Sequence, residues 1–254
     1  MLLAIDIGNS DIVFGVFDAH QWLPTWRHPS SQYLSVEETL HGMAATHQLD
    51  LRAFDRLILS SVVPGVTPQV RATLARLCGR EPLMVGPGIY EHLDIGIDNP
   101  QEIGSDLVAN AVAGHTRAGD QPCIVVDFGT ALTFTSVAAS GQILGVAIAP
   151  GLRTAMQALF FNTAQLPVVP LDLPASAIGK NTAHALQAGI LIGYIGLVKE
   201  LITRTSTELG GQCRVFATGG LAGRLSPLHD YFDEIDPMLT LDGLRLIADR
   251  VYGD

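Results

Sequence analysis

Apolar residues gather in short runs separated by turn-forming residues, a pattern typical of strands joined by tight connections. In the first half of the chain such runs occupy residues 2–7, 12–17, 21–26, 56–63 and 82–85. Helix-start signals follow the strands: a capping box at Ser35 and a Thr-Pro pair at Thr67, which we expect to be an N-cap followed by proline. We therefore expect helices over residues 35–47, 67–78 and 104–117.

The same order begins again in the second half. Strand-like runs occupy residues 123–126, 132–137, 142–148 and 214–218, and helices are expected over residues 151–160, 182–208 and 241–252. Each half opens with a strand that ends in Asp-x-Gly, at Asp6 and again at Asp127, 121 residues later. A single Asp-x-Gly is often only a turn, because both residues favour turns. Two copies at this spacing predict a duplicated α/β fold with domains 1–117 and 118–254.

Composition narrows the range of functions. The chain has 254 residues, a formal charge of −10 and no run of basic residues, so an extended nucleic-acid surface is not expected. Cys78, Cys123 and Cys213 form no CxxC pair, which argues against a zinc site or a disulfide framework. The most apolar segment, residues 186–198, is shorter than the ~20 residues of a transmembrane helix, so we expect no membrane contact and no signal peptide.

The two Asp-x-Gly loops are candidates for nucleotide chemistry. Gly8 and Gly129 allow backbone N–H groups to approach an anion. A carboxylate repels phosphate, so Asp6 and Asp127 must act through a cation. If the chain brings both loops to one cleft, the two carboxylates surround the phosphates of a nucleotide and its metal.

Two further features belong with these loops. The pair Gly219-Gly220 follows a strand and is expected to open a helix, where a ring or a phosphate can approach the backbone. Asp106 stands at a predicted helix start, where it is either an N-cap or an ionised base aimed at a substrate hydroxyl. The sequence contains no GxGxxG after its first strand and no GxxxxGK[ST], which disfavours a dinucleotide dehydrogenase and excludes a P-loop kinase.

In combination, these motifs resemble the superfamily of acetate and sugar kinases, chaperone ATPases and actin, and within it the type III pantothenate kinases along nearly the whole chain. The matching segments are IDIGNS around Asp6, VGPGI at 85–89, DNP at 98–100, GSD at 104–106 followed by ANAVA, VDFGTALTF from Val126, APG at 149–151, GKNT at 179–182, QAG at 187–189, ATGG from Ala217 and DPMLTLDGL at 236–244.

The resemblance implies a duplicated ribonuclease H-like fold of the actin-like ATPase type, with two mixed sheets flanked by helices. It implies an enzyme that phosphorylates pantothenate with ATP, the first step of coenzyme A synthesis, in the cytoplasm. ATP would contact a first phosphate loop of Asp6, Ile7, Gly8, Asn9, Ser10, Asp11, Ile12 and Val13, together with Gly129, Thr130, Gly219 and Gly220.

The resemblance also implies individual roles. Asp106 would be the general base, Asp6 would lie near Mg²⁺, and Asp127 would hold a monovalent cation, potassium or ammonium. Pantothenate would contact Gly104, Ser105, Asp106, Leu107 and Thr182. Family members are homodimers, so Thr182 is expected to reach the site of the neighbouring subunit, at the subunit interface.

Two positions depart from the family pattern. Leu107 stands where an Arg usually follows the catalytic Asp, and Ile97 stands where a Tyr often precedes Asp-Asn-Pro. An Arg at position 107 could pair with the anionic end of pantothenate, a contact worth about 1.5–3 kcal/mol. Two alternatives therefore remain: a non-catalytic regulatory homologue that binds nucleotide or pantothenate, and a kinase for another small hydroxyl acceptor.

Overall fold

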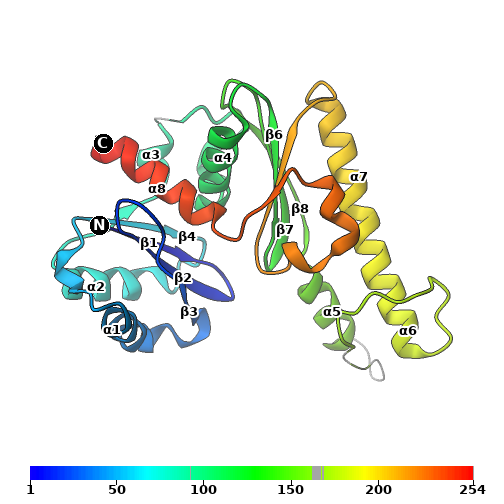
Figure 1. Cartoon of the computed structure of the whole chain (residues 1–254), viewed down its shortest axis with the longest axis horizontal. Coiled ribbons are helices and arrows are strands. Elements are labelled where there is room, and N and C mark those ends of the chain that lie inside the picture. The colour runs from blue at the N-terminus through cyan, green and yellow to red at the C-terminus, as the bar shows by residue number, and fades with distance from the viewer. Residues whose placement is uncertain (92, 162–166, 168, 254) are drawn as a thin grey trace. The chain divides into compact units, whose positions relative to one another are not determined.

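The computed structural model describes residues 1–91, 93–161, 167 and 169–253. These residues form two compact units: Met1–Ala113 together with Met238–Asp254, and Gly114–Pro237 (Figure 1). The expected division into 1–117 and 118–254 differs from these units at the end of the chain. The last helix, α8 (Leu239–Tyr252), packs on the first sheet, against β1 and β4.

The first unit is built on one mixed five-stranded sheet in the order β3-β2-β1-β4-β5. Neighbouring strands β1, β2 and β3 are antiparallel, whereas β4 and β5 run parallel to β1. The strands are β1 (Leu2–Ile7), β2 (Asp11–Phe17), β3 (Trp26–Pro29), β4 (Arg56–Ser61) and β5 (Leu83–Met84).

Helices cover both faces of this sheet (Figure 1). Alternate residues of β1, among them Leu3 and Ile5, form a core with apolar side chains of α1 and α2. On the other face, α8 buries Leu241 and Leu244. The helices of this unit are α1 (Val36–His47), α2 (Thr67–Cys78), α3 (Pro87–Tyr90), α8 and most of α4 (Ser105–Ala118), with 3-10 turns at Ser30–Ser35, Leu51–Ala53 and Pro100–Glu102.

The second unit repeats the first. Its sheet order, β10-β9-β6-β7-β8, is the same arrangement read from the opposite edge, with the same strand directions. Both β1 and β6 have six residues and the same burial pattern, in which only the Asp is incompletely buried. The duplicated fold is therefore confirmed. The strands are β6 (Cys123–Phe128), β7 (Ala131–Val137), β8 (Ile143–Pro150), β9 (Arg214–Thr218) and β10 (Glu234–Ile235).

The helical segment Thr182–Glu208 of the second unit is continuous but not uniform. It consists of α6 (Thr182–Gln187), a π-helical turn (Ala188–Ile192) and α7 (Gly193–Glu208), and it follows α5 (Leu152–Phe161) along the chain. By length and composition it could cross a membrane, with a mean hydropathy of 1.5 over its most apolar window, of which 39% is buried. One such helix is a weak indication, since core helices of globular proteins have the same properties.

Three local expectations were wrong. Ser35 does not form a capping box, because its hydroxyl donates to the carbonyl of Gln32. Thr67 is not an N-cap but a residue of the helix, and its hydroxyl donates to the carbonyl of Val63. The third strand starts at Trp26 rather than near residue 21, because Trp22 forms only an isolated bridge with Phe17 and its indole N–H donates to Asp242.

Candidate active site

The loop after β1 is a closed turn held from two sides. The backbone N–H of Gly8 donates to the carbonyl of Asp11 at 3.0 Å. Ser30, at the start of the 3-10 turn after β3, donates its hydroxyl to the carbonyl of Gly8 at 2.6 Å and its backbone N–H to the carbonyl of Ser10 at 2.9 Å. Its own hydrogen bond and the two from Ser30 thus fix the loop that the sequence predicts to bind phosphate.

Within that predicted phosphate loop, side chains differ in what they can offer a ligand. Asn9 and Ser10 are exposed at the tip, and Gly8 is partly exposed. Ile7 and Ile12 are fully buried in the core, so only their backbone groups can meet a ligand. Gly8 is constrained by space, because a Cβ there would lie 3.3 Å from the carbonyl oxygen of Asp11.

Two serines link Asp6 to the start of α4. The hydroxyl of Ser60 donates to Asp6 Oδ1 at 2.9 Å and lies 2.9 Å from the hydroxyl oxygen of Ser105. The backbone N–H of Ser61 donates to Ser105 Oγ at 2.9 Å. Sequence reasoning missed Ser60; the available signal was a hydroxyl pair at the end of a buried strand, where β4 runs parallel to β1.

Asp106 lies in the first turn of α4. Its side chain is partly exposed, but the surrounding protein desolvates it, and this burial raises the pKa of Asp106 above the ordinary value. The backbone N–H of Leu107 donates to Asp106 Oδ1 at 2.8 Å and has a smaller, opposite effect on that pKa. A helix start by itself would lower the pKa of a carboxylate, but desolvation of Asp106 is the larger effect.

Small residues and a tyrosine shape the surroundings of Asp106. A Cβ on Gly104 would lie 2.5 Å from Asp106 Oδ1, so the carboxylate occupies space that only glycine leaves free. Tyr90 is buried and donates its hydroxyl to the carbonyl of Ile103 at 3.2 Å. Burial, with the charge of Asp106 as a second cause, raises the pKa of Tyr90 to about 12, so Tyr90 remains a hydrogen-bond donor at neutral pH.

Leu107 differs from the residues around it. Its side chain is 7% exposed and belongs to the buried interior of α4. A leucine there satisfies the core but offers no group to a polar ligand, so only its backbone is available for the contact that the sequence predicts.

In the second unit, glycines crowd around Asp127. Gly219 has a φ of +89°, and a Cβ on it would lie 2.5 Å from Asp127 Oδ1; a Cβ on Gly129 would lie 3.6 Å from the same oxygen. Both predicted glycines therefore belong to the immediate surroundings of Asp127. Gly220 follows directly, but the glycine pair opens only the 3-10 turn Ala222–Arg224 rather than a long helix.

The loop after β6 is anchored to the next helix, α5. The carbonyl of Thr130 accepts the backbone N–H of Gly151 at 3.0 Å and the hydroxyl of Thr154 at 2.7 Å. Tyr194 of α7 is buried beside Phe128, and burial, followed by the nearby charge of Asp127, raises its pKa. The nearby backbone N–H of Leu152 lowers the pKa of Tyr194, although it makes no hydrogen bond of ordinary geometry with the Tyr194 hydroxyl.

Thr182 is the first residue of α6 and is exposed. The preceding Asn181 caps this helix, because its side-chain oxygen accepts the backbone N–H of His184 at 2.9 Å. The structure thus groups Asp6, Ser105 and Asp106 in the first unit and Asp127, Gly129 and Gly219 in the second.

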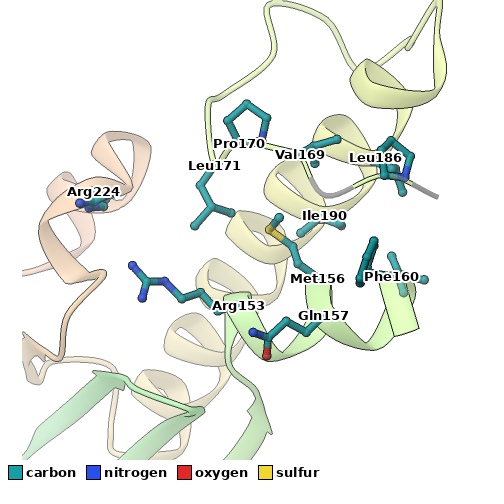
Figure 2. Close-up of a pocket in the computed structure, with 12 residues that line it drawn as sticks. Arg153, Met156, Gln157, Phe160, Val169, Pro170, Leu171, Leu186, Ile190 and Arg224 are labelled. Carbon is teal, nitrogen blue, oxygen red and sulfur yellow. The ribbon is translucent and has the colours of Figure 1, made fainter. Parts of the chain in front are cut away.

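A pocket of about 320 Å³ lies elsewhere in the second unit, between α5, α6 and the segment around Leu171 (Figure 2). Met156, Phe160 and Ile190 supply apolar walls, and Arg153 and Arg224 lie at one end. None of the residues predicted from the sequence lines it. Among the described residues, no group of three or more His, Cys, Asp or Glu side chains is arranged to hold a metal ion.

Comparisons with known proteins identify the family of this chain. Residues 2–204 match the family described as "Type III pantothenate kinase". A protein of that name from Moorella thermoacetica is 44% identical over 253 residues, covering 98% of this chain and 99% of that protein. One from Treponema pallidum subsp. pallidum is 45% identical over 260 residues, covering 97% and 93%.

Solved structures share the fold at lower identity. A Campylobacter jejuni protein assigned to the Baf family of transcriptional activators superposes with a TM-score of 0.62 at 18% identity, over 99% of this chain and 100% of its own. The ethanolamine utilization protein EutJ from Carboxydothermus hydrogenoformans gives 0.55 at 13% identity, over 96% and 89%. These two likenesses concern the fold alone. The family match and the full-length relatives settle the assignment: this chain belongs to the type III pantothenate kinase family.

Proposed function

We propose that this chain transfers a phosphoryl group from ATP to the primary hydroxyl of pantothenate, with Asp106 as the general base. Membership of the family supports the activity, a step of coenzyme A biosynthesis. The observation that carries the role of Asp106 is its environment: a carboxylate with a pKa raised by burial, at a helix start linked through Ser105 and Ser60 to Asp6.

The environment of Asp106 suits late proton transfer. Phosphoryl transfer has a loose transition state, so the acceptor hydroxyl gives up its proton late and needs a base that is held in position. The Leu107 N–H orients the carboxylate, and a raised pKa makes it a better proton acceptor than an ordinary Asp. Ser60 holds Asp6, the residue that we place near Mg²⁺ through intervening water.

The surroundings of Asp127 fit a monovalent cation, potassium or ammonium. A Cβ on Gly219 would lie 2.5 Å from the Asp127 carboxylate oxygen, so glycine lets the backbone approach this acidic group closely. Such a cation would neutralise phosphate charge. We propose that ATP contacts backbone groups of Asp6 to Val13, and of Gly129, Thr130, Gly219 and Gly220.

The acceptor side of the site departs from what the anionic end of pantothenate requires, because Leu107 is buried and no arginine stands at that position. Ile97, half-buried, offers no hydroxyl in place of the usual Tyr. Both observations favour one second candidate, a kinase of the same mechanism with a different small hydroxyl acceptor. We retain Gly104, Ser105 and Thr182 as acceptor contacts in either case.

We further propose that the enzyme is a cytoplasmic homodimer whose second copy covers an apolar surface of the second unit. Ile148, Phe161 and Ile178 are 69%, 76% and 78% exposed, and a second copy that covered them would remove this apolar area from water. The helical segment Thr182–Glu208, which begins with Thr182, is also largely unburied in its most apolar window. A second copy on this surface would account for both observations.

The experiment that tests the activity measures ADP release by purified protein with ATP, Mg²⁺ and pantothenate, in potassium, ammonium or sodium salts. Turnover that requires pantothenate and disappears in Asp106→Asn is the expected result. Turnover with a hydroxyl analogue but not with pantothenate would favour the second candidate. Nucleotide binding without turnover on any acceptor would show a regulatory homologue and overturn the proposal.

A further inference from the structure

We propose that the hydroxyl of Thr133 is a second oxygen ligand for the cation held at Asp127. The inference rests on the proposed cation site and deepens it by naming a residue that the motifs did not assign. Its basis is a juxtaposition in the second sheet: an acidic side chain and a buried hydroxyl without a partner, on adjacent strands and on the same face.

Strand register places the two side chains together. In the antiparallel pair β6–β7, Asp127 lies directly opposite Thr133. Directly opposed residues of an antiparallel pair project to the same face, with their Cβ atoms about 4.5–5.5 Å apart. A threonine side chain is short, so its hydroxyl remains close to the carboxylate of its cross-strand neighbour.

The hydroxyl of Thr133 lacks an explanation within the fold. The residue is 8% exposed, and its Oγ1 is buried with no hydrogen-bond partner among the residues that the structure describes. Leaving a buried hydroxyl without a partner is unfavourable, and such groups commonly face a water or an ion. What sets Thr133 apart is that this unpartnered oxygen lies directly opposite an acidic side chain, where it can serve a cation.

The chemistry of the ligand follows from the donor set. A monovalent cation such as potassium is coordinated by several oxygen atoms, many of them uncharged. Among the described residues no cluster of three acidic, His or Cys side chains is present, so Asp127 needs uncharged oxygens beside it. Thr133 supplies one, and the nearby loop can supply backbone carbonyls.

The chain contains a matched control two residues further along the same strand. Thr135 projects to the same face, is 1% exposed, and also has a buried Oγ1 with no partner among the described residues. It lies opposite Val125 rather than Asp127. If buried threonines on β7 were only a strand preference, Thr133→Val and Thr135→Val would behave alike.

The test is thermal unfolding of the full-length protein titrated with KCl at constant ionic strength, with choline chloride as the replacement salt. Wild type should show a Tm that rises with potassium. Thr133→Val should keep or exceed the wild-type Tm in choline chloride, since it removes an unpartnered hydroxyl. The potassium concentration that gives half of the Tm increase should be at least about tenfold higher in Thr133→Val than in wild type. This is the fold-change expected for the loss of one contact to a charge.

Thr135→Val should titrate as wild type does, Thr133→Ser should restore the response because it keeps Oγ, and Asp127→Asn should abolish it. The inference would be overturned if Thr133→Val responded to potassium as wild type does, or if the Tm of wild type did not change with potassium. ADP release from the same samples separates this result from the proposed function. A Thr133-dependent potassium response without pantothenate turnover leaves the cation site intact and removes the kinase assignment.

Discussion

Asp106 combines a functional requirement with a cost in stability. Its pKa is raised by burial, so the folded chain favours the protonated form more than the unfolded chain does. Stability from this group is complete below the unfolded pKa near 3.8 and is lost as pH rises through the higher folded value. At neutral pH the ionised carboxylate therefore weakens the fold while it serves as a base.

We expect Asp106→Asn to lower kcat by about 10²–10⁴-fold, the range of a lost general base, and to raise the free energy of unfolding at pH 8. The gain in stability should shrink towards pH 4, because a larger share of the wild-type carboxyl is protonated there than at pH 8. Urea unfolding at both pH values measures it. Asp18→Asn is the opposite control, because backbone N–H groups of Gln21 and His20 lower the pKa of Asp18. If Asp106→Asn proves less stable than wild type at pH 8, the burial argument is contradicted.

Tyr90 fixes the segment that carries the base. Tyr90→Phe removes only the hydrogen bond to the Ile103 carbonyl and should cost about 1 kcal/mol of stability. We expect kcat to fall by more than the loss of folded protein explains, with the KM for ATP unchanged. Tyr252→Phe is the matched control, since its hydroxyl donates to the Leu57 carbonyl at 3.4 Å. Equal kinetics in both variants would leave Tyr90 with a structural role alone.

At the scale of elements, close contact between α4 and α8 closes one face of the first unit. A Cβ on Gly243 of α8 would lie 1.9 Å from the carbonyl oxygen of Ala109, and Thr240 donates its hydroxyl to Asn110 at 2.8 Å. The backbones of the two helices therefore approach as closely as glycine allows. This contact also explains why the last helix belongs with the first sheet.

Substitution of glycine by alanine should have opposite effects in two helices of the same unit. Gly42→Ala in α1 should stabilise by about 1 kcal/mol, because alanine favours a helix and the new Cβ meets Trp26 at an ordinary 3.6 Å. Gly243→Ala should destabilise by about 2 kcal/mol or more, because the helices must separate. Chemical denaturation of both variants measures the difference, and stabilisation by Gly243→Ala would mean that α4 and α8 do not pack this closely.

The sequence predicts those elements that local pattern determines. The strands that carry Asp6 and Asp127, the helix that begins at Ser105 and the repeated order could all be predicted. Alternation, glycines and polar residues near strand ends are properties of neighbouring residues. Ser60 and Thr133 were missed, since their importance comes from pairing with an acid on another strand. The packing of α8 on the first sheet was missed for the same reason. Its apolar face could cover either sheet, and the choice depends on the contact of Gly243 with Ala109, which is distant in sequence.

At the scale of the whole molecule, the apolar surface of the second unit is the feature that one chain does not explain. Its exposed side chains come from β8, from the end of α5, where Phe160 and Phe161 stack edge to face, from the segment before α6, and from the π-helical turn. We propose that a protein partner covers these exposed apolar groups. The proposed partner is a second copy.

We expect sedimentation equilibrium to give twice the chain mass of 27.0 kDa for wild type, and Ile178→Asp to shift the mass towards one chain. A charge at this 78% exposed position should leave the monomer folded, because it costs nothing until a partner buries it. Leu34→Asp is the control: Leu34 is 74% exposed but belongs to the first unit.

Because Thr182 is proposed to serve the neighbouring subunit, Ile178→Asp should also lose pantothenate turnover while still binding ATP. A dimer that persists in Ile178→Asp places the interface elsewhere, and an active wild-type monomer removes the shared site altogether.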